Sequence, residues 1–366
     1  MYKDDNRIVM TLDAGGTNFV FSAIQGNREI VTPVNLAAQP ELLDSCLQSL
    51  VSGFKQVRGQ LVQKPVAISF AFPGPADYKH GVIGDLPNFP AFRGGVALGR
   101  YLENQFGIPV YINNDGNLFA YGEALTGILP DLNQKLKDSG NDRQFKNLIG
   151  ITLGTGFGAG VVIGRELLTG DNGCGGDLWN FKNLYYPDMI AEESVSIRAV
   201  KRVYADLSGD TNVNLTPKDI CDIADGVKQG DVGVARKSFS TLGYALGDAI
   251  AYALTLIDGV VVIGGGLSGA ARYILPAVME SLRKKLALHT GESFSRLQMQ
   301  VLNLEDEAQL ADLLKPEIET VSVYRTNILV PYNRVKKTGL AISRLGTSRA
   351  VALGAYAFAL NELDKL

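Results

Sequence analysis

Two glycine-rich tips, each at the end of an apolar strand, carry the residue types that bind phosphate. The first is "LDAGGTN" at 12–18 and the second is "LGTGFG" at 153–158. Backbone N–H groups with no side chain in front of them form a concavity for phosphate oxygens. Thr17 and Thr155 add hydroxyl groups. The residues predicted to hold the phosphates are Gly15, Gly16, Thr17, Asn18, Gly154, Thr155 and Gly156. The alternative is a pair of tight hairpin turns without a ligand.

Carboxylates at strand ends predict the rest of the chemistry. Asp13 ends the first strand beside a phosphate concavity, so its carboxylate is suited to hold Mg²⁺, directly or through water. Asp115 follows the apolar run "IPVYIN", and strand carboxyl ends in open α/β sheets face the ligand crevice. We therefore predict Asp115 as a general base, with Asn88 in the loop "LPNF" reaching the same crevice. Asp115 could instead cap the next helix, and both roles are compatible.

A third glycine motif, "VIGGGLSGA", contains Gly264-x-Gly266-x-x-Gly269 after a strand and before a helix. This spacing fits a dinucleotide-binding fingerprint, as in a nicotinamide-dependent oxidoreductase. It fits equally well a glycine-rich contact with the adenosine of a nucleotide, for which Gly265 and Gly266 are the candidates. A P-loop of the Walker type is absent from the sequence.

The elements that must position these residues alternate between strands and helices, which predicts an α/β fold. Short apolar strands at 8–13, 18–24 and 29–34 precede a helix at about 40–60, a buried strand at 65–72 and a strand at 108–115. The order restarts at 148–163 with a strand, a glycine tip and a strand. A helix at 231–257 and a closing amphipathic helix follow. This repetition predicts two similar halves with a cleft between them.

Composition excludes several classes of protein. The chain has 366 residues, a formal net charge of −3 and no basic block, so we expect no nucleic-acid or membrane partner. The N-terminus lacks an apolar signal segment, and the apolar run Ala249–Ile257 is too short for a membrane span. Three scattered cysteines and two distant histidines predict neither disulfides nor a zinc site. We expect a cytoplasmic enzyme.

The motifs, in this order, resemble the ROK family of sugar kinases and sugar-responsive repressors, within the actin/hexokinase-like ATPase superfamily. "DAGGTNFVFSAI" is similar to the first phosphate motif of the family, and "PGPAD…PNF…INNDGNLFAYGE" to its sugar-binding stretch. "LGTGFGAGVVIGRELLTGDNGCGGD" resembles the second phosphate motif and "VVVIGGGLS" the adenosine motif. The resemblance covers most of the chain.

The resemblance implies ATP- and Mg²⁺-dependent phosphorylation of a hexose hydroxyl, as in glucokinase, with an amino-sugar or fructose as other acceptors. Asp115 would be the catalytic base, while Asn88 and Asn114 would hold sugar hydroxyls. Glu192 stands near the later sugar-binding glutamate of the family. The resemblance also implies a homo-oligomer, a dimer.

The sequence departs from the family where Glu-x-Gly-His is expected. Asp177-Leu178-Trp179-Asn180 stands there, and Asn180 replaces the histidine that contacts sugar and ligates zinc. The cysteine-rich zinc motif that should follow is absent, so we predict no zinc site. Asp177 and Asn180 can still hydrogen-bond a sugar, and Trp179 either stacks on the sugar or packs in the core. The altered pocket also motivates an alternative, a non-catalytic sugar or nucleotide sensor.

The implied architecture is two ribonuclease H-like (actin-like ATPase) domains around a central cleft. The first would span residues 1–124, completed by the C-terminal helix at about 348–366. The second would span 125–347, with insertions relative to a compact family member at about 130–147 and 303–340. Only about seven residues precede the first strand, which leaves no room in this sequence for the DNA-binding helix-turn-helix of the family's repressors.

Overall fold

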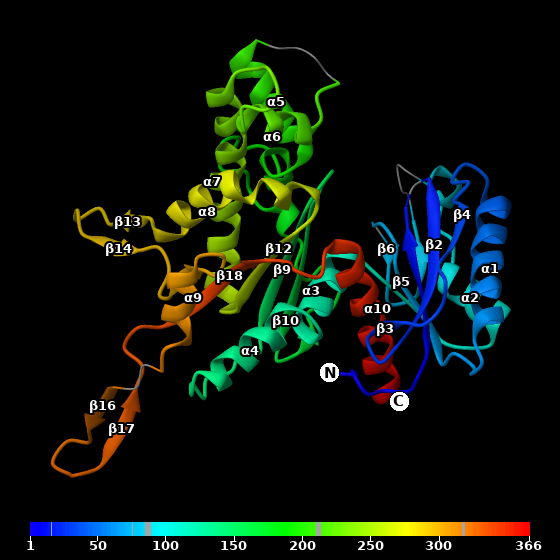
Figure 1. Ribbon diagram of the computed structural model, residues 1–366, viewed down its shortest axis with the longest axis horizontal. Coiled ribbons are helices and arrows are strands. Elements are labelled where there is room, and N and C mark those ends of the chain that lie inside the picture. The colour runs from blue at the N-terminus through cyan, green and yellow to red at the C-terminus, as the bar shows by residue number, and fades with distance from the viewer. Residues whose placement is uncertain (16, 75, 85–88, 210–213, 317–318) are drawn as a thin grey trace. The chain divides into compact units, whose positions relative to one another are not determined.

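The chain forms two compact units, each built around a six-stranded sheet. A computed structural model describes residues 1–366 except 16, 75, 85–88, 210–213 and 317–318 (Figure 1). Unit 1 comprises Met1–Gly127, Gly160–Gly176 and Leu345–Leu366, and unit 2 comprises Ile128–Ala159 and Asp177–Arg344. The segment 160–176, which the sequence boundaries assign to the second domain, therefore belongs to unit 1. The α/β class predicted from the sequence is confirmed.

The sheet of unit 1 combines an antiparallel hairpin with parallel strands. Its order is β3-β2-β1-β5-β8, with β4 paired to β2. The strands are β1 Val9–Ala14, β2 Asn18–Gln25, β3 Arg28–Glu29, β4 Val34–Ala37, β5 Ala67–Ala71 and β8 Val110–Asn113. Strand β1 runs antiparallel to β2 and parallel to β5, and β5 is parallel to β8. The carboxyl ends of β1, β5 and β8 therefore share one edge of the sheet.

Helices cover both faces of this sheet. They are α1 Leu43–Gln60, α2 Leu98–Phe106, α3 Asp115–Leu125 and α10 Thr347–Asp364, with the short elements β6 Ala76–Asp77, β7 Val82–Ile83, η1 Pro90–Phe92 and β11 Glu166–Leu167. Helices α3 and α10 cross with almost no space between their backbones. A Cβ at Gly354 would lie 1.9 Å from the Leu118 carbonyl oxygen, and one at Gly122 would lie 2.0 Å from that of Ala350. Both positions therefore require glycine.

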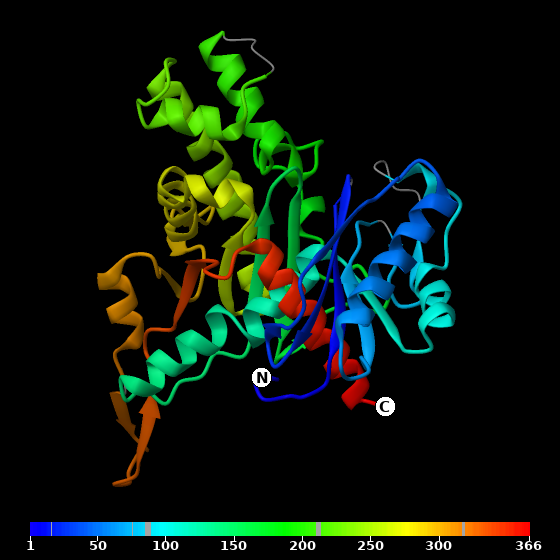
Figure 2. The same cartoon turned by 45° about the vertical axis from the view of Figure 1, so that its right-hand side comes forward.

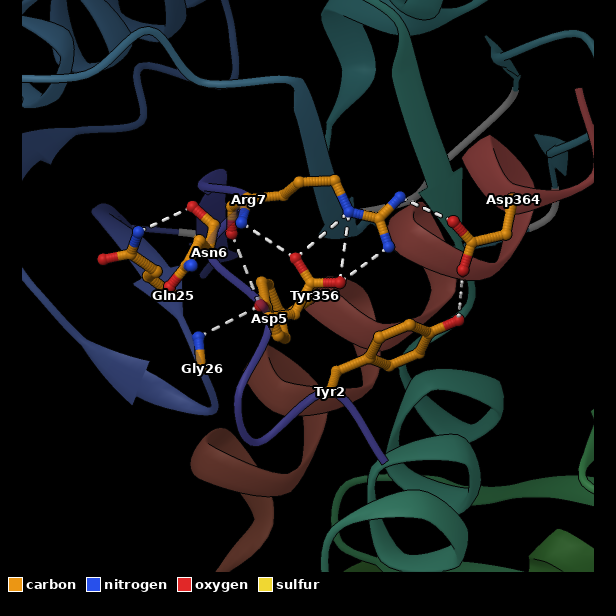
Figure 3. Close-up of polar contacts among 8 residues, drawn as sticks. All are labelled: Tyr2, Asp5, Asn6, Arg7, Gln25, Gly26, Tyr356 and Asp364. Atoms are coloured by element: carbon orange, nitrogen blue, oxygen red, sulfur yellow. Dashed lines mark hydrogen bonds and ion pairs between the residues drawn. The ribbon is translucent and has the colours of Figure 1, made fainter.

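The N-terminal segment is fastened to α10 by polar contacts (Figure 3). The Arg7 guanidinium donates to Asp364 Oδ1 at 2.6 Å and to Asp5 Oδ2 at 2.7 Å. The Tyr2 hydroxyl donates to Asp364 Oδ2 at 3.1 Å, and the Gly26 amide donates to the Tyr356 hydroxyl at 3.0 Å. Hydrogen bonds from Arg7 hold the pKa values of Asp5 and Asp364 below the ordinary aspartate range. These contacts fix α10, and through it α3, to the start of the sheet.

The second sheet repeats the plan of the first. Its order is β11-β10-β9-β12-β18-β15, and β12 is parallel to both β9 and β18. Its strands besides β11 are β9 Leu148–Leu153, β10 Phe157–Ile163, β12 Val260–Gly264, β15 Gln300–Asn303 and β18 Lys337–Ile342. The predicted insertion at 303–340 therefore overlaps a central strand of the sheet. The short apolar run "KTGLAI" supplies that strand, and its brevity hid it within a polar stretch.

The helices of unit 2 are α4 Ile128–Asp138, α5 Ile197–Ser208, α6 Pro217–Ala224, α7 Val232–Ile257, α8 Ala271–Arg283 and α9 Glu307–Leu314. The 3-10 turns are η2 Leu178–Asn180, η3 Ala191–Ser194 and η4 Gly266–Ala270. Two small hairpins complete the unit: β13 Lys285–Ala287 with β14 Ser293–Ser295, and β16 Glu319–Ser322 with β17 Leu329–Tyr332.

Helix α4 overlaps the stretch at about 130–147 that the resemblance predicts as an insertion relative to a compact family member. Its buried face consists of Ile128, Leu129, Leu132 and Leu136, which recur at helical spacing among charged residues. The Asn133 side chain also exchanges two hydrogen bonds of 2.8 Å with the backbone of Phe145. The stretch is thus a packed part of unit 2.

Helix α7 is the central helix of the unit 2 core. Within the described part of the chain it is the single helix whose length and composition would suffice to cross a membrane, and 56% of that window is buried. Gly243 and Gly247 allow close packing, because a Cβ there would lie 2.5 Å from the Ile274 carbonyl oxygen and 2.6 Å from the Ser281 Cβ. These two glycines therefore let α7 and α8 pack closely.

Candidate active site

Asp13 and Asp115 lie at the same edge of the unit 1 sheet. Pairing aligns Asp13 with Ala71 of β5, and Ala71 with Asn113 of β8, two residues before Asp115. Neighbouring strands are about 4.8 Å apart, so the two aspartates stand about two strand spacings from each other. The Asp13 charge contributes to the raised pKa of Asp115, which agrees with this proximity. The structure therefore places Asp13 and Asp115 at strand ends, as predicted.

Asp115 is the first residue of α3 and has an exposed carboxylate. Desolvation by the surrounding protein raises its pKa, although the Gly116 amide, which donates to Asp115 Oδ1 at 2.8 Å, opposes that rise. A carboxylate with a raised pKa is a stronger proton acceptor than an ordinary aspartate while its exposure keeps it accessible. The local structure thus suits a general base.

Asn114, not Asp115, is the N-cap of α3. Its Oδ1 accepts a hydrogen bond of 2.8 Å from the Gly116 amide. The capping alternative for Asp115 is therefore wrong, because the residue before it already fills that position. Asn113, which is buried, accepts from the Asn114 amide at 2.8 Å and from the Asn117 side chain at 3.0 Å. Asn113 and Asn117 thus hold the turn between β8 and α3, a role that the sequence analysis did not identify.

The first glycine tip joins β1 to β2 as a hairpin, as predicted. Asp13, Thr17 and Asn18 are exposed around it, and the Thr17 carbonyl accepts from the Ala38 amide at 2.9 Å. Among the described residues, the side chain of Asp13 has no hydrogen-bond or ion-pair partner, which leaves its carboxylate oxygens available to a hard cation. Gly16 and Asn88 lie outside the described residues.

The second glycine tip, between β9 and β10, has its carbonyl groups hydrogen-bonded within unit 2 but two of its amides free. The Gly154 amide donates to the Gly156 carbonyl at 3.0 Å, and the Gly154 carbonyl accepts from the Ile197 amide at 2.9 Å. The amides of Thr155 and Gly156 have no partner among the described residues. A Cβ added at Gly154 would meet open space. The tip therefore offers free donors in an open position, which is what a phosphate oxygen needs.

Glu192 and its partner Arg198 hydrogen-bond to the backbone of the second glycine tip. Glu192 Oε2 accepts from the Phe157 amide at 3.0 Å, and its Oε1 accepts from Arg198 Nη2 at 3.0 Å. Arg198 Nη1 in turn donates to the Thr155 carbonyl at 3.3 Å. The predicted sugar contact of Glu192 remains a prediction, and the structure adds a contact with the second glycine tip. The sequence analysis did not identify Arg198, because this residue belongs to none of the motifs.

The turn that carries Glu192 is organised by Asn183, which is buried. Asn183 Oδ1 accepts from the Tyr185 amide at 2.9 Å and from the Ser194 hydroxyl at 3.0 Å, and its Nδ2 donates to the Ile190 carbonyl at 2.9 Å. One amide side chain thus fastens residues 183–194 at three points.

Within the described residues, the structure has no cluster of three or more histidine, cysteine or acidic side chains that could hold a metal ion.

Asp177 precedes the turn η2 and Asn180 is its last residue, and both are exposed. Burial raises the pKa of Asp177, and a hydrogen bond with the Trp179 side chain opposes the rise. Trp179 is 37% exposed, so the core-packing alternative for it is wrong, and Leu178 fills the core instead. The two polar side chains and the indole are available to a ligand.

The third glycine motif forms a strand, a turn and a helix, as expected. Gly265 has φ +90 and its Cβ would lie 2.3 Å from the Leu153 carbonyl oxygen, so it must be glycine to pack against β9. A Cβ at Gly266 would meet open space, and Gly266 is exposed. The motif therefore lies beside the end of β9, which leads into the second tip.

A cavity of about 1450 Å³ in unit 2 contains none of the predicted site residues. It lies over α7 and α8 and is lined by both charged and apolar side chains, among them Tyr185, Asp248, Met279 and Arg296. Concavity alone would therefore misplace the site, and the chemistry of the strand ends identifies it better.

Comparison with known proteins supports the interpretation of these motifs. The model of the ROK family matches residues 9–179. A crystal structure of glucokinase from Parabacteroides distasonis is 57% identical, covers 99% of both chains and superposes with a TM-score of 0.90. A glucokinase from Streptomyces coelicolor is 25% identical over 76% of this chain and 88% of that protein. An N-acetyl-D-glucosamine kinase from Aliivibrio salmonicida is 32% identical over 45% of this chain and 50% of that protein. The similarity to the crystal structure of the Parabacteroides distasonis glucokinase confirms the predicted ribonuclease H-like fold.

Proposed function

This chain belongs to the ROK family, and we propose that it is an ATP-dependent hexose kinase of the glucokinase type. The carrying observation is Asp115, a carboxylate of raised pKa that is exposed at the same sheet edge as the first glycine tip. The 57% identity to a glucokinase supports the same reaction. Glucose is accordingly the first acceptor to test, and N-acetylglucosamine the second.

In the proposed reaction Asp115 accepts the proton of a sugar hydroxyl as its oxygen attacks the γ-phosphorus of ATP. The bond from that phosphorus to the β,γ-bridging oxygen breaks, and ADP leaves. Asn114 is engaged as the cap of α3, so its side-chain NH₂ group remains to hold a sugar hydroxyl. Asn88, Asp177, Asn180 and Glu192 are proposed as further sugar contacts. Phosphoryl transfer needs mainly positioning and charge stabilisation, which suits this set of residues.

The phosphates are proposed to bind at the two glycine tips, where the free amides of Thr155 and Gly156 are donors. Gly15, Gly16, Thr17, Asn18 and Gly154 complete that contact, and Gly265 and Gly266 adjoin the adenosine. Asp13 fits a magnesium ion, directly or through water, because its carboxylate has no protein partner among the described residues. The ion would neutralise phosphate charge.

We also propose a cytoplasmic enzyme that acts on a small sugar, binds neither nucleic acid nor membrane, and associates as a homodimer. The net charge of −3 supports the absence of attraction to polyanions. The three cysteines are free, which agrees with a reducing compartment.

The test measures ADP release with a panel of hexoses and amino-sugars, with and without Mg²⁺. We expect turnover that depends on one hexose and on Mg²⁺, and its loss in Asp115→Asn. The Asp131→Asn variant, on the exposed face of α4, serves as the control and should keep wild-type turnover. Sugar binding in calorimetry without turnover would contradict the proposal and favour a sensor.

A further inference from the structure

The start of α8 carries an arginine that is fixed in place beside the third glycine motif. Arg272 is the second residue of α8, and its Nη1 donates to the Gly269 carbonyl of η4 at 3.1 Å. Its Nε donates to Asp225 Oδ1 at 3.1 Å, and its Nη2 donates to Asp225 Oδ2 and, at 3.3 Å, to Cys221 Sγ. Cys221 lies in α6 and Asp225 directly follows it, and α6 and α8 both pack against α7 (Figures 1 and 2). The guanidinium therefore links η4 and α6 to the start of α8.

These contacts occupy most of the donors of the guanidinium. Arginine has five N–H donors in one plane, and four of those of Arg272 have a partner. Bidentate binding of a phosphate needs two free donors, which Arg272 does not have. The side chain is nevertheless 50% exposed. Because the edge of the guanidinium is occupied, what Arg272 offers to a ligand is the flat face of this group.

One side of the guanidinium is covered by the ring of Tyr273. The guanidinium carbon lies 4.9 Å from the centroid of that ring, and the Tyr273 hydroxyl donates to Asp225 Oδ1 at 2.6 Å. The ring also stacks on Phe239, with the two centroids 6.1 Å apart and an angle of 21° between the planes. Arg272 thus adds a flat cation to a stack of planar side chains. A planar ring on its exposed side would continue that stack, because arginine binds aromatic faces by cation–π contact and stacking.

Arg272 lies next to the place proposed for the adenosine. Gly265 and Gly266 begin the turn η4, and Arg272 is bonded to a later carbonyl of the same turn. Arg272 also lines the cavity of about 1450 Å³, together with Ile342, the last residue of β18. Ile342 pairs with Ile263 of β12, the strand that leads into Gly265. The open space at Arg272 therefore reaches the strand ends from which the third glycine motif starts.

We propose that the exposed face of Arg272 is a platform on which the adenine ring of ATP stacks. This proposal rests on the proposed kinase function, from which it takes the nucleotide and its position at the third glycine motif. A purine has a larger π face than a pyrimidine, so the platform favours adenine over uracil. Arg272 thereby distinguishes nucleotides by their base, whereas the two glycine tips bind the phosphates that all nucleotides share.

The experiment measures the dissociation constants of ADP, UDP and tripolyphosphate for the full-length chain by calorimetry in the presence of Mg²⁺. We expect the wild type to bind ADP more tightly than UDP. Arg272→Met should weaken ADP binding about tenfold, as expected for loss of a partly desolvated cation–π contact, and should change tripolyphosphate binding by less than about twofold. An equal loss of affinity for ADP and tripolyphosphate would show that Arg272 binds phosphate and would overturn the proposal.

Two further variants separate stacking from the structural role of Arg272. Arg272→Lys keeps a positive charge that can pair with Asp225 but has no flat face, so it should weaken ADP binding nearly as much as Arg272→Met. The matched control is Arg236→Met. It removes a guanidinium of α7 that fastens the end of α6, through the Ala224 carbonyl at 2.9 Å, and that is not among the residues that line the cavity. This control should bind ADP as the wild type does. Equal weakening in Arg236→Met and Arg272→Met would assign the effect to the attachment of α6 and overturn the platform.

The same proteins distinguish this proposal from the kinase function. Arg272→Lys should raise the KM for ATP and change the KM for the sugar by less than about twofold. Unchanged ADP affinity in Arg272→Lys, with hexose-dependent turnover intact, would overturn the platform and leave the kinase function standing. A wild type that binds ADP without phosphorylating any hexose would contradict the kinase function, while weaker ADP binding by Arg272→Lys would still support the platform. A wild type with no affinity for ADP would overturn both.

Discussion

Arg198 and Glu192 form an ion pair of 3.0 Å that holds the second glycine tip on both sides. Arg198 donates to the carbonyl of Thr155, and Glu192 accepts from the amide of Phe157. These contacts restrain the backbone at Thr155 and Phe157, on either side of Gly156, and so limit the movement of the free amides of Thr155 and Gly156. The pair therefore fixes the donors that we propose for ATP.

We predict that Arg198→Met raises the KM for ATP about tenfold and leaves the KM for the sugar within about twofold, because loss of one hydrogen bond to a charged group costs about 1.5 kcal/mol. Arg198→Lys should show an intermediate effect. The control is Arg202→Met, which removes an ion pair of 3.4 Å with Glu193 but makes no contact with the tip. Equal effects of the two methionine variants would rule out a specific role for Arg198.

Asp115→Asn should lower kcat by about 10³-fold, the range attributed to a general base. In the wild type, kcat/KM should fall in acid around a pKa above the ordinary aspartate value, as Asp115 becomes protonated. A profile that stays flat down to the ordinary aspartate pKa would speak against this base.

The same substitution should make the protein slightly more stable at neutral pH. The pKa of Asp115 is higher in the folded than in the unfolded chain, so its protonated form is favoured by folding. Protonated Asp115 contributes fully to the stability of the fold when the pH is below the pKa of an unfolded aspartate. This contribution is lost as the pH rises through the higher pKa of the folded protein. We therefore expect a higher Tm for Asp115→Asn at pH 7, and no difference at strongly acidic pH.

Gly354→Ala should destabilise the protein by about 3 kcal/mol, because the new methyl group would collide with the Leu118 carbonyl 1.9 Å away. Separation of α10 from α3 would also displace Asp115 and lower kcat. Gly59→Ala, in α1, is the control. Nothing lies within 4 Å of a Cβ at this position, so the higher helix propensity of alanine should raise the free energy of unfolding by about 0.5–1 kcal/mol. Urea denaturation measures both changes.

Asp364→Asn should weaken the attachment of the N-terminal segment shown in Figure 3. Asp364 is 46% exposed, so we expect a loss of only about 1 kcal/mol at pH 7. Its pKa is lowered in the folded chain, so the stabilisation is present above the ordinary aspartate pKa and is lost as pH falls through the lowered value. Variant and wild type should therefore converge in strong acid. Glu362→Gln, which breaks a neighbouring ion pair with Lys365, is the control and should have a smaller effect.

The sequence predicted those features that local residue patterns encode. The hairpin β1–β2 and the strand before Asp115 follow from alternating apolar residues and glycines. The N-terminus of α6 follows from Thr216 and Pro217, residue types that favour the N-cap and the first helical position and that occupy those positions in the structure. The predicted helix at about 40–60 is α1, whose apolar residues recur at helical spacing.

Other features lay beyond local patterns. Helix α4 and strand β18 were hidden because their apolar residues are few and are diluted by charged neighbours, so only burial against the rest of unit 2 defines them. The cap of α3 fell on Asn114 rather than Asp115 because adjacent residues both suit that position, and the backbone path after β8 selects between them.

The sequence by itself determined the chemistry available to this protein: two glycine tips, the carboxylates Asp13 and Asp115, and the order of motifs that marks the ROK family. These are local, because a tip needs only adjacent residues. The tertiary structure alone decided which distant groups support them. Arg198 reaches Thr155 across 43 positions, and α10 packs on α3 through Gly354 at the far end of the chain. Such contacts depend on how helices and sheets pack, which no short stretch of sequence specifies.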